Sequence, residues 1–401
     1  MLCVLVYVRT GCGLRTVVSI LRIFEEVMGE TFGKVPCYNT VANWVRKLGL
    51  SVYDDDPAVG TRYAITLDES IMINKEKLLL VLGYSSEHNG KPLEHKDVTV
   101  LGMKVGASFK RDDIKKEINR ITQRIGTAPD YGISDGAHNL VGGFKDANIT
   151  HHLDISHTLG NCMKHVYGDD KDFKALLGEL GKKRLQYQMT DKAWLLPPNT
   201  RAIARFMNLS GWVEWAKSML ECYDTLNDKM KEAYAFLLPY RELVGELSRD
   251  ISAIRHVENI CKNNGFCERT NALCQTYIER NVLANANSRQ ASLGLEMLEY
   301  FQRQSKLLRN PEEVRHISTD IIESDFGIFK AKKSPNKLYG ITSLVLMLPL
   351  YPKAIDYSVS KNQDFKERLA NVKLKDIALW AKENLSENRV TLRSKTLKSV
   401  S

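Results

Sequence analysis

Three acidic residues stand where a buried strand or a helix would present them. Asp68 follows the apolar run 63–67, Asp135 closes the run 131–134, and Glu323 lies in 321–330, where apolar residues recur at helical spacing. A carboxylate in or at the end of a buried strand is costly to desolvate unless a cation or donor compensates it. Oxygen ligands from distant elements are what Mg²⁺ and Mn²⁺ prefer. These residues therefore predict metal-dependent phosphoryl transfer, as in an enzyme that processes DNA.

The two aspartates share a local pattern. Residues 63, 65 and 67 face one way along the first strand, while residues 64, 66 and Asp68 face the other. Asp135 lies between Ser134 and Gly136, where the fourth strand would end. Ligands of open α/β sheets bind at the carboxyl ends of parallel strands, so both carboxylates could reach one metal. The alternative is an aspartate at a strand end that bonds to a turn.

The order of the expected elements predicts the fold that would bring these residues together. Strands are expected over 62–73, 78–85 and 97–105, then a helix over 109–125, a strand over 128–134, a helix over 137–147 and a strand over 149–155. Three antiparallel strands followed by two crossovers is the order of an RNase H-like fold. The predicted class is α/β, a five-stranded mixed sheet flanked by helices.

Residues 161–310 interrupt this order. They lack strand-like alternation and are rich in helix formers, with breaks at Pro197-Pro198 and 285–288. This pattern predicts an all-helical insertion before the helix with Glu323. The expected segments are a helix-turn-helix module (1–55), the first part of the RNase H-like core (60–160), the insertion (161–310), the core helix with the third acidic residue (311–350) and a basic carboxy-terminal segment (351–401).

The first fifty residues hold two expected helices. Residues 14–28 have apolar residues at helical spacing, and a break at 29–36 precedes a second helix that Asn39 would cap and Gly49 would end. Such a pair resembles a helix-turn-helix, although plain structural hairpins look the same. The residues expected to contact DNA on the second helix are Asn39, Thr40, Asn43, Arg46 and Lys47.

Positive charge is concentrated near the carboxyl terminus. The chain has 401 residues and a formal net charge of +9, and residues 330–401 contain fifteen Lys or Arg against six Asp or Glu. Lys330, Lys332 and Lys333 could meet a DNA phosphate backbone. The alternative is a solvated basic surface or a frayed tail.

Three further residues could assist the acidic triad. Asp154 and His157 lie three apart at the junction of the fifth strand and its helix, where they could contact the scissile phosphate or orient metal ligands. The structural alternative is a histidine that caps or braces the insertion. Lys330 lies seven residues after Glu323, two turns along the same helical face.

Composition excludes some other classes. The longest apolar stretch, 341–351, is much shorter than the roughly 20 residues that a membrane helix needs. The apolar start of the chain has neither the basic residues nor the cleavage site of a secretory signal. The eight cysteines fit no zinc spacing, so we expect free thiols in a reducing cytoplasm.

The acidic motifs resemble those of bacterial insertion-sequence DDE transposases with an RNase H-like core. The motifs are Thr66-Leu-Asp68, Ser134-Asp-Gly-Ala-His-Asn-Leu140 and Ile322-Glu-Ser-Asp-Phe-Gly-Ile-Phe-Lys330. The Asp154-x-x-His157 step before a long helical segment is similar to a signature of hAT-like transposases. The spacing of Glu323 and Lys330 resembles the tyrosine–arginine–glutamate–lysine signature of a large insertion-sequence group. His316 and Thr319 occupy its tyrosine and arginine positions, which leaves the lineage open.

The resemblance implies a complete set of functional expectations. Asp68, Asp135 and Glu323 would hold two Mg²⁺ or Mn²⁺ ions, and the same site would cleave and join DNA strands. The implied partners are double-stranded DNA, both transposon ends and target, and further copies of the chain on that DNA. No membrane is implied, and the expected location is the bacterial cytoplasm, at the nucleoid.

Two alternative functions stay open. One is an RNase H-like nuclease or resolvase that cuts DNA without joining it. The other is an inactive, DNA-binding descendant of a transposase, an alternative that the abrupt start of the chain, Met1-Leu-Cys-Val-Leu5, keeps open.

Overall fold

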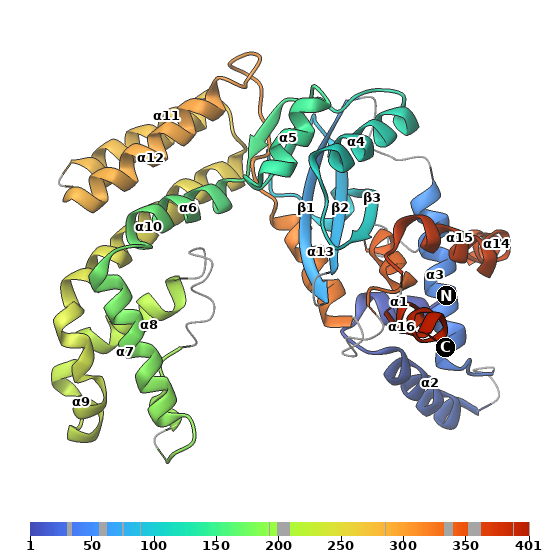
Figure 1. Cartoon of the computed structure of the whole chain (residues 1–401), viewed down its shortest axis with the longest axis horizontal. Coiled ribbons are helices and arrows are strands. Elements are labelled where there is room, and N and C mark those ends of the chain that lie inside the picture. The colour runs from blue at the N-terminus through green and yellow to red at the C-terminus, as the bar shows by residue number, and fades with distance from the viewer. Residues whose placement is uncertain are drawn as a thin grey trace. The chain divides into compact units, whose positions relative to one another are not determined.

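The chain folds into two compact units of different architecture. The computed structural model describes residues 1–29, 34–55, 62–73, 76–88, 90–191, 193–198, 209–284, 286–332, 340–351, 362–387 and 389–400. Unit 1 consists of Met1–His88, Leu93–His151 and Thr319–Ser401, and unit 2 consists of Asn89–Pro92 and His152–Ser318. Figure 1 shows the strands in unit 1 and the long helices of unit 2.

Unit 1 is built on a five-stranded mixed sheet with the order β3-β2-β1-β4-β5. β1 is antiparallel to β2 and parallel to β4, and β2 is antiparallel to β3. The strands are β1 (Tyr63–Ile73), β2 (Glu76–Ser85), β3 (Thr99–Gly106), β4 (Gly132–Ser134) and β5 (His151–Leu153). The predicted α/β class, with an open mixed sheet flanked by helices, is confirmed, and it is compatible with an RNase H-like fold.

Two helices cover one face of the sheet. They are α4 (Arg111–Ile125) and α5 (His138–Asp146). Ile65 and Leu67 of β1 are fully buried there against Ile114 of α4 and Phe144 of α5. The alternation of β1 therefore agrees with the prediction from its sequence, because residues 63, 65 and 67 all belong to this core.

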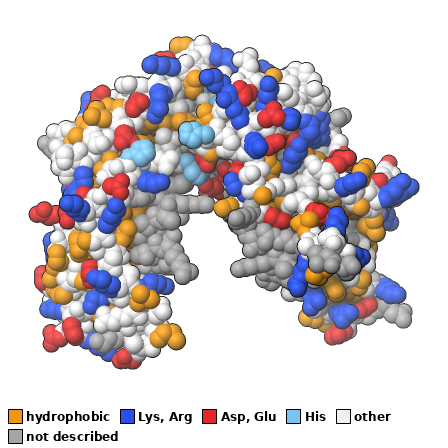
Figure 2. Space-filling model, in the orientation of Figure 1, with side chains coloured by type: hydrophobic (Ala, Val, Ile, Leu, Met, Phe, Trp, Pro, Cys, Tyr) orange, Lys and Arg blue, Asp and Glu red, His pale blue; other side chains and the backbone are white. Residues whose placement is uncertain are grey.

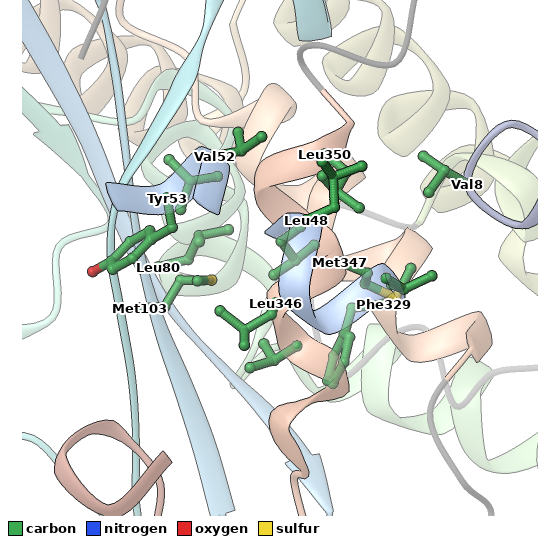
Figure 3. Packing of buried hydrophobic residues seen from close by; sticks show 14 of the residues in the cluster. Val8, Leu48, Val52, Tyr53, Leu80, Met103, Phe329, Leu346, Met347 and Leu350 are labelled. Carbon is green, nitrogen blue, oxygen red and sulfur yellow. The ribbon is translucent and has the colours of Figure 1, made fainter. Parts of the chain in front are cut away.

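Helices from both ends of the chain cover the opposite face. They are α1 (Leu2–Arg9), α3 (Tyr38–Asp54), α13 (Asp320–Lys332) and the 3₁₀ helix η9 (Ser343–Leu350). Figure 3 shows Leu80 and Met103 of the sheet packed with Leu48 of α3, Leu346 of η9 and Phe329 of α13. α2 (Leu14–Met28) packs on α1 and α3 through the buried residues Val17, Val18 and Leu21.

Helix α3 is a core helix, longer than the sequence predicted. It begins at Tyr38, with Cys37 rather than Asn39 at the N-cap, and Gly49 does not end it. A Cβ on Gly49 would lie 1.8 Å from the backbone oxygen of Leu346 in η9. The glycine is needed because the two backbones touch there, so the predicted helix end at Gly49 is wrong.

The carboxy-terminal helices α14 (Asn362–Asn371) and α15 (Leu374–Asn384) pack on α3. Trp380 of α15 meets the Tyr53 ring edge-on, with centroids 6.2 Å apart. Arg368 of α14 bonds to Asp55 at 2.8 Å. These two helices therefore belong to the core of unit 1, and α16 (Arg389–Val400) follows them as the last described helix.

The described part of unit 2 is helical, apart from an isolated bridge between Phe266 and Arg315. Its helices are α6 (Ile155–Tyr167), α7 (Lys171–Tyr187), α8 (Ser210–Glu221), α9 (Asp228–Tyr234), α10 (Arg241–Asn264), α11 (Glu268–Ile278) and α12 (Ser288–Ser305). They share one apolar core. A hydrogen bond from the Ile155 amide to the Ile317 carbonyl joins the two ends of the unit.

The helix-turn-helix prediction is not confirmed as a separate module. Residues 1–55 belong to the same compact unit as the sheet, apart from residues 30–33, whose placement is outside the described residues. Because α3 lies between the sheet, η9 and α14, it forms part of the hydrophobic core.

The contact between α3 and η9 generates a stability prediction. Gly49→Ala should lower the free energy of unfolding of unit 1 by about 3 kcal/mol, because the new methyl group overlaps a backbone oxygen. Gly327→Ala on α13 is the matched control, since a Cβ there meets nothing within 4 Å. Helix propensity should make that control up to about 1 kcal/mol more stable. Urea denaturation followed by amide exchange of unit 1 peptides measures both, and equal stabilities would contradict the prediction.

Candidate active site

The pairing of β1 with β4 relates Asp68 to Asp135. Ile65 pairs with Gly132 and Thr66 with Ile133 in a parallel ladder. The same register, continued by two residues, would set Asp68 opposite Asp135 on strands that lie about 4.8 Å apart. β1 runs on to Ile73, so Asp68 lies in the middle of its strand, whereas Asp135 directly follows the carboxyl end of β4.

Asp68 lies on the face of the sheet that α13 covers. Ala64 and Ile133 belong to the hydrophobic core on that face. Side chains two residues apart along a strand share a face, which places Asp68 with Ala64. Asp135 follows Ile133 by two positions, one residue past the end of β4. The predicted position at a strand end therefore holds for Asp135, whereas Asp68 is a mid-strand residue.

Each aspartate also organises its own backbone. Asp68 is 9% exposed, and its Oδ1 accepts a hydrogen bond from the Glu69 amide at 2.7 Å. Asp135 is half-buried, and its Oδ1 accepts from the Ala137 amide at 3.0 Å in the turn that starts α5. Burying a carboxylate costs free energy, and the hydrogen bonds from these two amides offset part of that cost.

Glu323 lies on α13, the helix that contacts β1 on the same face. Ile322 and Phe326 are buried in the core, whereas Glu323 and Lys330 are exposed. Lys330 lies over the Phe326 ring, with its Nζ 5.9 Å from the centroid. Glu323 and Lys330 are thus two turns apart beside the buried stripe of the helix, as predicted.

The three carboxylates supply suitable donors without forming a closed ligand cluster. Carboxylate oxygens from different elements suit Mg²⁺ or Mn²⁺. Within the described residues, no three His, Cys, Asp or Glu side chains form a group that could hold an ion. Neighbouring carboxylates repel one another, and a divalent cation removes that repulsion.

Asp154 and His157 form a helix cap in unit 2. Asp154 is the N-cap of α6, is 1% exposed, and its Oδ2 accepts from the His157 amide at 2.7 Å. The same oxygen lies 2.9 Å from His157 Nδ1. This geometry agrees with the structural alternative, in which the pair caps the first helix of the helical segment.

The predicted DNA-binding residues of α3 are mostly engaged within unit 1. Asn39 is exposed, whereas Thr40, Asn43, Arg46 and Lys47 are half-buried. Arg46 donates to Asn43 Oδ1 at 3.0 Å, and Lys47 donates to the Leu369 carbonyl of α14 at 3.0 Å. Burial lowers the pKa of Arg46. These contacts give both cations a role in packing α3.

The lysines at and after the end of α13 differ in their surroundings. Lys332 donates to the carbonyls of Tyr7 and Thr10, and it lies 4.1 Å from the Tyr7 ring centroid. Burial lowers the pKa of Lys332 to about 8. Lys333 lies outside the described residues. Figure 2 shows Lys and Arg interspersed with Asp and Glu on the visible face, so a phosphate contact there would depend on individual side chains.

The sequence analysis missed a buried pair next to Glu323. Asp325 is 0% exposed, and its Oδ1 lies 3.1 Å from His95 Nδ1, in an ion pair without the alignment of a hydrogen bond. Burial raises the pKa of Asp325, and contact with Asp325 raises the pKa of His95. The available signal was an aspartate within the apolar stripe of Ile322, Phe326 and Phe329.

The sheet defines an α/β protein with one aspartate in the middle of β1 and another directly after β4, the parallel neighbour of β1. No protein-family model and no curated protein matches the chain. Within the described residues, no helix is both long enough and apolar enough to cross a membrane.

The Asp154 cap generates a prediction for unit 2. Asp154→Ala should lower its free energy of unfolding by about 1–2 kcal/mol, because α6 loses its capping acceptor. Asp154→Asn keeps an oxygen acceptor and should restore most of that stability. Amide exchange of α6 and α12 peptides measures both effects, and equal losses in the two variants would argue against the cap.

His151 generates a prediction about acid stability. Its Nε2 lies 2.7 Å from Ser134 Oγ, and its ring stacks on Phe144. Burial lowers the pKa of His151 to about 4 in the folded chain. Between pH 6.5 and 4 the imidazole therefore binds a proton more readily in the unfolded chain than in the folded one. The resulting loss of stability on acidification, at most about 3 kcal/mol, should be absent in His151→Gln. Denaturation of both proteins at pH 7 and pH 4.5 measures it.

Proposed function

We propose that the chain is a DDE-type transposase that cleaves and joins DNA strands with divalent metal ions. The observation that supports this most is the parallel pairing of β1 with β4, because Asp68 and Asp135 each follow the paired residues by two positions and α13, the helix of Glu323, contacts β1. In this proposal the sheet and α13 form an RNase H-like core, and unit 2 is its helical insertion.

Asp68, Asp135 and Glu323 would hold two Mg²⁺ or Mn²⁺ ions. When bound, such ions activate the attacking oxygen and stabilise the leaving oxygen of a phosphodiester. Asp68 and Asp135 are attached to paired strands, so their separation is set by the sheet. Glu323 lies on a helix, so its approach depends on how α13 packs.

Lys330 is suited to a DNA phosphate near this site. It is exposed two turns beyond Glu323, and a cation there would bind the phosphate backbone of either a transposon end or target DNA. Asn39 is the exposed member of the set proposed on α3, near the start of that helix. End recognition by residues 1–55, assembly of several copies on DNA and a nucleoid location complete the proposal.

A nuclease that cuts without joining would use the same carboxylates. The two functions differ in the fate of the 3′-hydroxyl, which attacks a second DNA molecule only in a transposase. An assay with labelled end DNA and a supercoiled target plasmid separates them, because joining produces a covalent product longer than either cleavage fragment.

Cleavage should depend on Mg²⁺ or Mn²⁺ and should not be restored by Zn²⁺. The reason is the all-oxygen donor set of the proposed site. The substrate is the DNA that flanks the open reading frame, tested with metal, with chelator and with metal restored. Strand cleavage that survives complete chelation would refute the proposal.

Glu323→Gln should reduce cleavage by several orders of magnitude, because it removes the charge of a metal ligand and preserves size. DNA affinity and thermal stability should stay near those of the parent chain. Glu367→Gln on α14 is the control, since it makes the same change at another exposed helical position in unit 1. Cleavage by the Glu323 variant at the rate of this control would exclude Glu323 from the site.

A further inference from the structure

Asp325 is a buried carboxylate in a stripe that otherwise packs through apolar side chains. Its neighbours Ile322, Phe326 and Phe329 lie in the core of unit 1, and Asp325 itself is 0% exposed. Burying a carboxylate costs free energy that an apolar residue of similar size would not cost. The packing of α13 therefore gives no reason for an aspartate at this position.

Among the described residues, Asp325 forms an ion pair with a histidine from a separate element. His95 lies in the 3₁₀ turn η2 (His95–Asp97) before β3, and its Nδ1 is 3.1 Å from Asp325 Oδ1. Its Nε2 is 3.3 Å from Ser324 Oγ. Two consecutive residues of α13 thus contact the two nitrogens of one imidazole.

The η2 turn is itself held in place. Glu94 and Asp97 form a reciprocal capping box, with the Glu94 amide donating to Asp97 Oδ2 at 2.9 Å. Asp97 also lies 3.7 Å from His88 Nε2. The imidazole therefore contacts α13 from a braced turn.

An ion pair of this kind restricts rotation of a helix more than an apolar stripe does. Apolar packing is non-directional, whereas a contact between two named atoms fixes one position of the helix. Residues 323 and 325 are two positions apart, about 200° around the helix. When Asp325 is held against His95, Glu323 lies on the side of α13 away from His95, beside the buried stripe.

We propose that His95 and Asp325 are positioning residues that fix the rotation of α13 about its axis and so direct Glu323. Their effect on catalysis rests on the proposed function, because it acts through Glu323. Their effect on the rotation of the helix is independent of the proposed function. A buried polar side chain fixes register in some coiled coils.

The test compares Asp325→Leu, Asp325→Asn, His95→Leu and His95→Gln in the full chain. Asp325→Leu removes the buried charge, and the partly exposed His95 that remains can lose its proton, so the thermal midpoint should stay near that of the parent chain. Cleavage turnover at saturating DNA should nevertheless fall about 10- to 100-fold. DNA affinity should stay within about twofold, because no group placed on DNA changes. His95→Gln keeps a side-chain donor and should retain more activity than His95→Leu. A merely structural pair would instead make turnover follow thermal stability.

Amide exchange gives a readout independent of activity. Exchange of α13 amides should increase about tenfold in Asp325→Leu, while β1 and β2 amides stay protected. Should the leucine variant fail to fold, Asp325→Asn replaces it, since it preserves shape and removes charge.

Each outcome is decisive. Unchanged α13 exchange would overturn the proposal, whatever the activity. Increased exchange with normal turnover would overturn the link to Glu323, provided that Glu323→Gln is inactive. If Glu323→Gln cleaves normally, the proposed function fails, and α13 exchange alone decides whether the pair positions the helix.

Discussion

The parallel pairing of β1 with β4 is the constraint on which the rest of unit 1 depends. This pairing is short. The backbone amide of Ile65 donates a hydrogen bond to the Tyr131 carbonyl, and the amide of Asp130 donates one to the Tyr63 carbonyl. A parallel pair needs a crossover connection and cover on both faces. Helices α4 and α5 provide one cover, and α3, α13 and η9 provide the other. The register of this pair also decides which residues meet at the end of the sheet.

Covering the second face requires segments from both ends of the chain. Helix α3 touches η9 so closely that Gly49 has no room for a side chain, and α14 and α15 pack behind it. This arrangement explains why Arg46 and Lys47 have partners within the unit. A helix that is needed for the core retains few exposed side chains for another molecule. Any recognition of DNA by α3 would therefore depend on its exposed amino-terminal end.

Three buried aspartates illustrate how environment sets the role of a carboxylate. Asp154 is 1% exposed and caps a helix, so the α6 amino terminus compensates its charge. Asp325 is 0% exposed in mid-helix and faces His95. Asp68 is 9% exposed in the middle of β1, on the strand that pairs with β4, and Asp135 directly follows β4. Two like charges brought near each other favour a cation. The metal site predicted for these two residues stays a prediction.

The sequence by itself determined the features that have a local period. The alternation of residues 63–68 predicted the two faces of β1, and the spacing of Ile322, Phe326 and Phe329 predicted the buried side of α13; both are confirmed. The order of strands and helices predicted an open mixed sheet because crossover rules leave few topologies. Residue type and position also identified Asp68, Asp135 and Glu323 as candidates, and their role stays a prediction.

Only the tertiary structure decided features that depend on distant partners. Gly49 resembles a helix end until Leu346, almost 300 residues later, occupies the space beside it. Lys47 resembles a DNA contact, but its ammonium group donates a hydrogen bond to the Leu369 carbonyl. The partner of Asp325 is His95, 230 residues earlier in the chain, and no spacing in the sequence relates the two. Burial and pairing arise from contacts between residues far apart in the chain, and no local period encodes them.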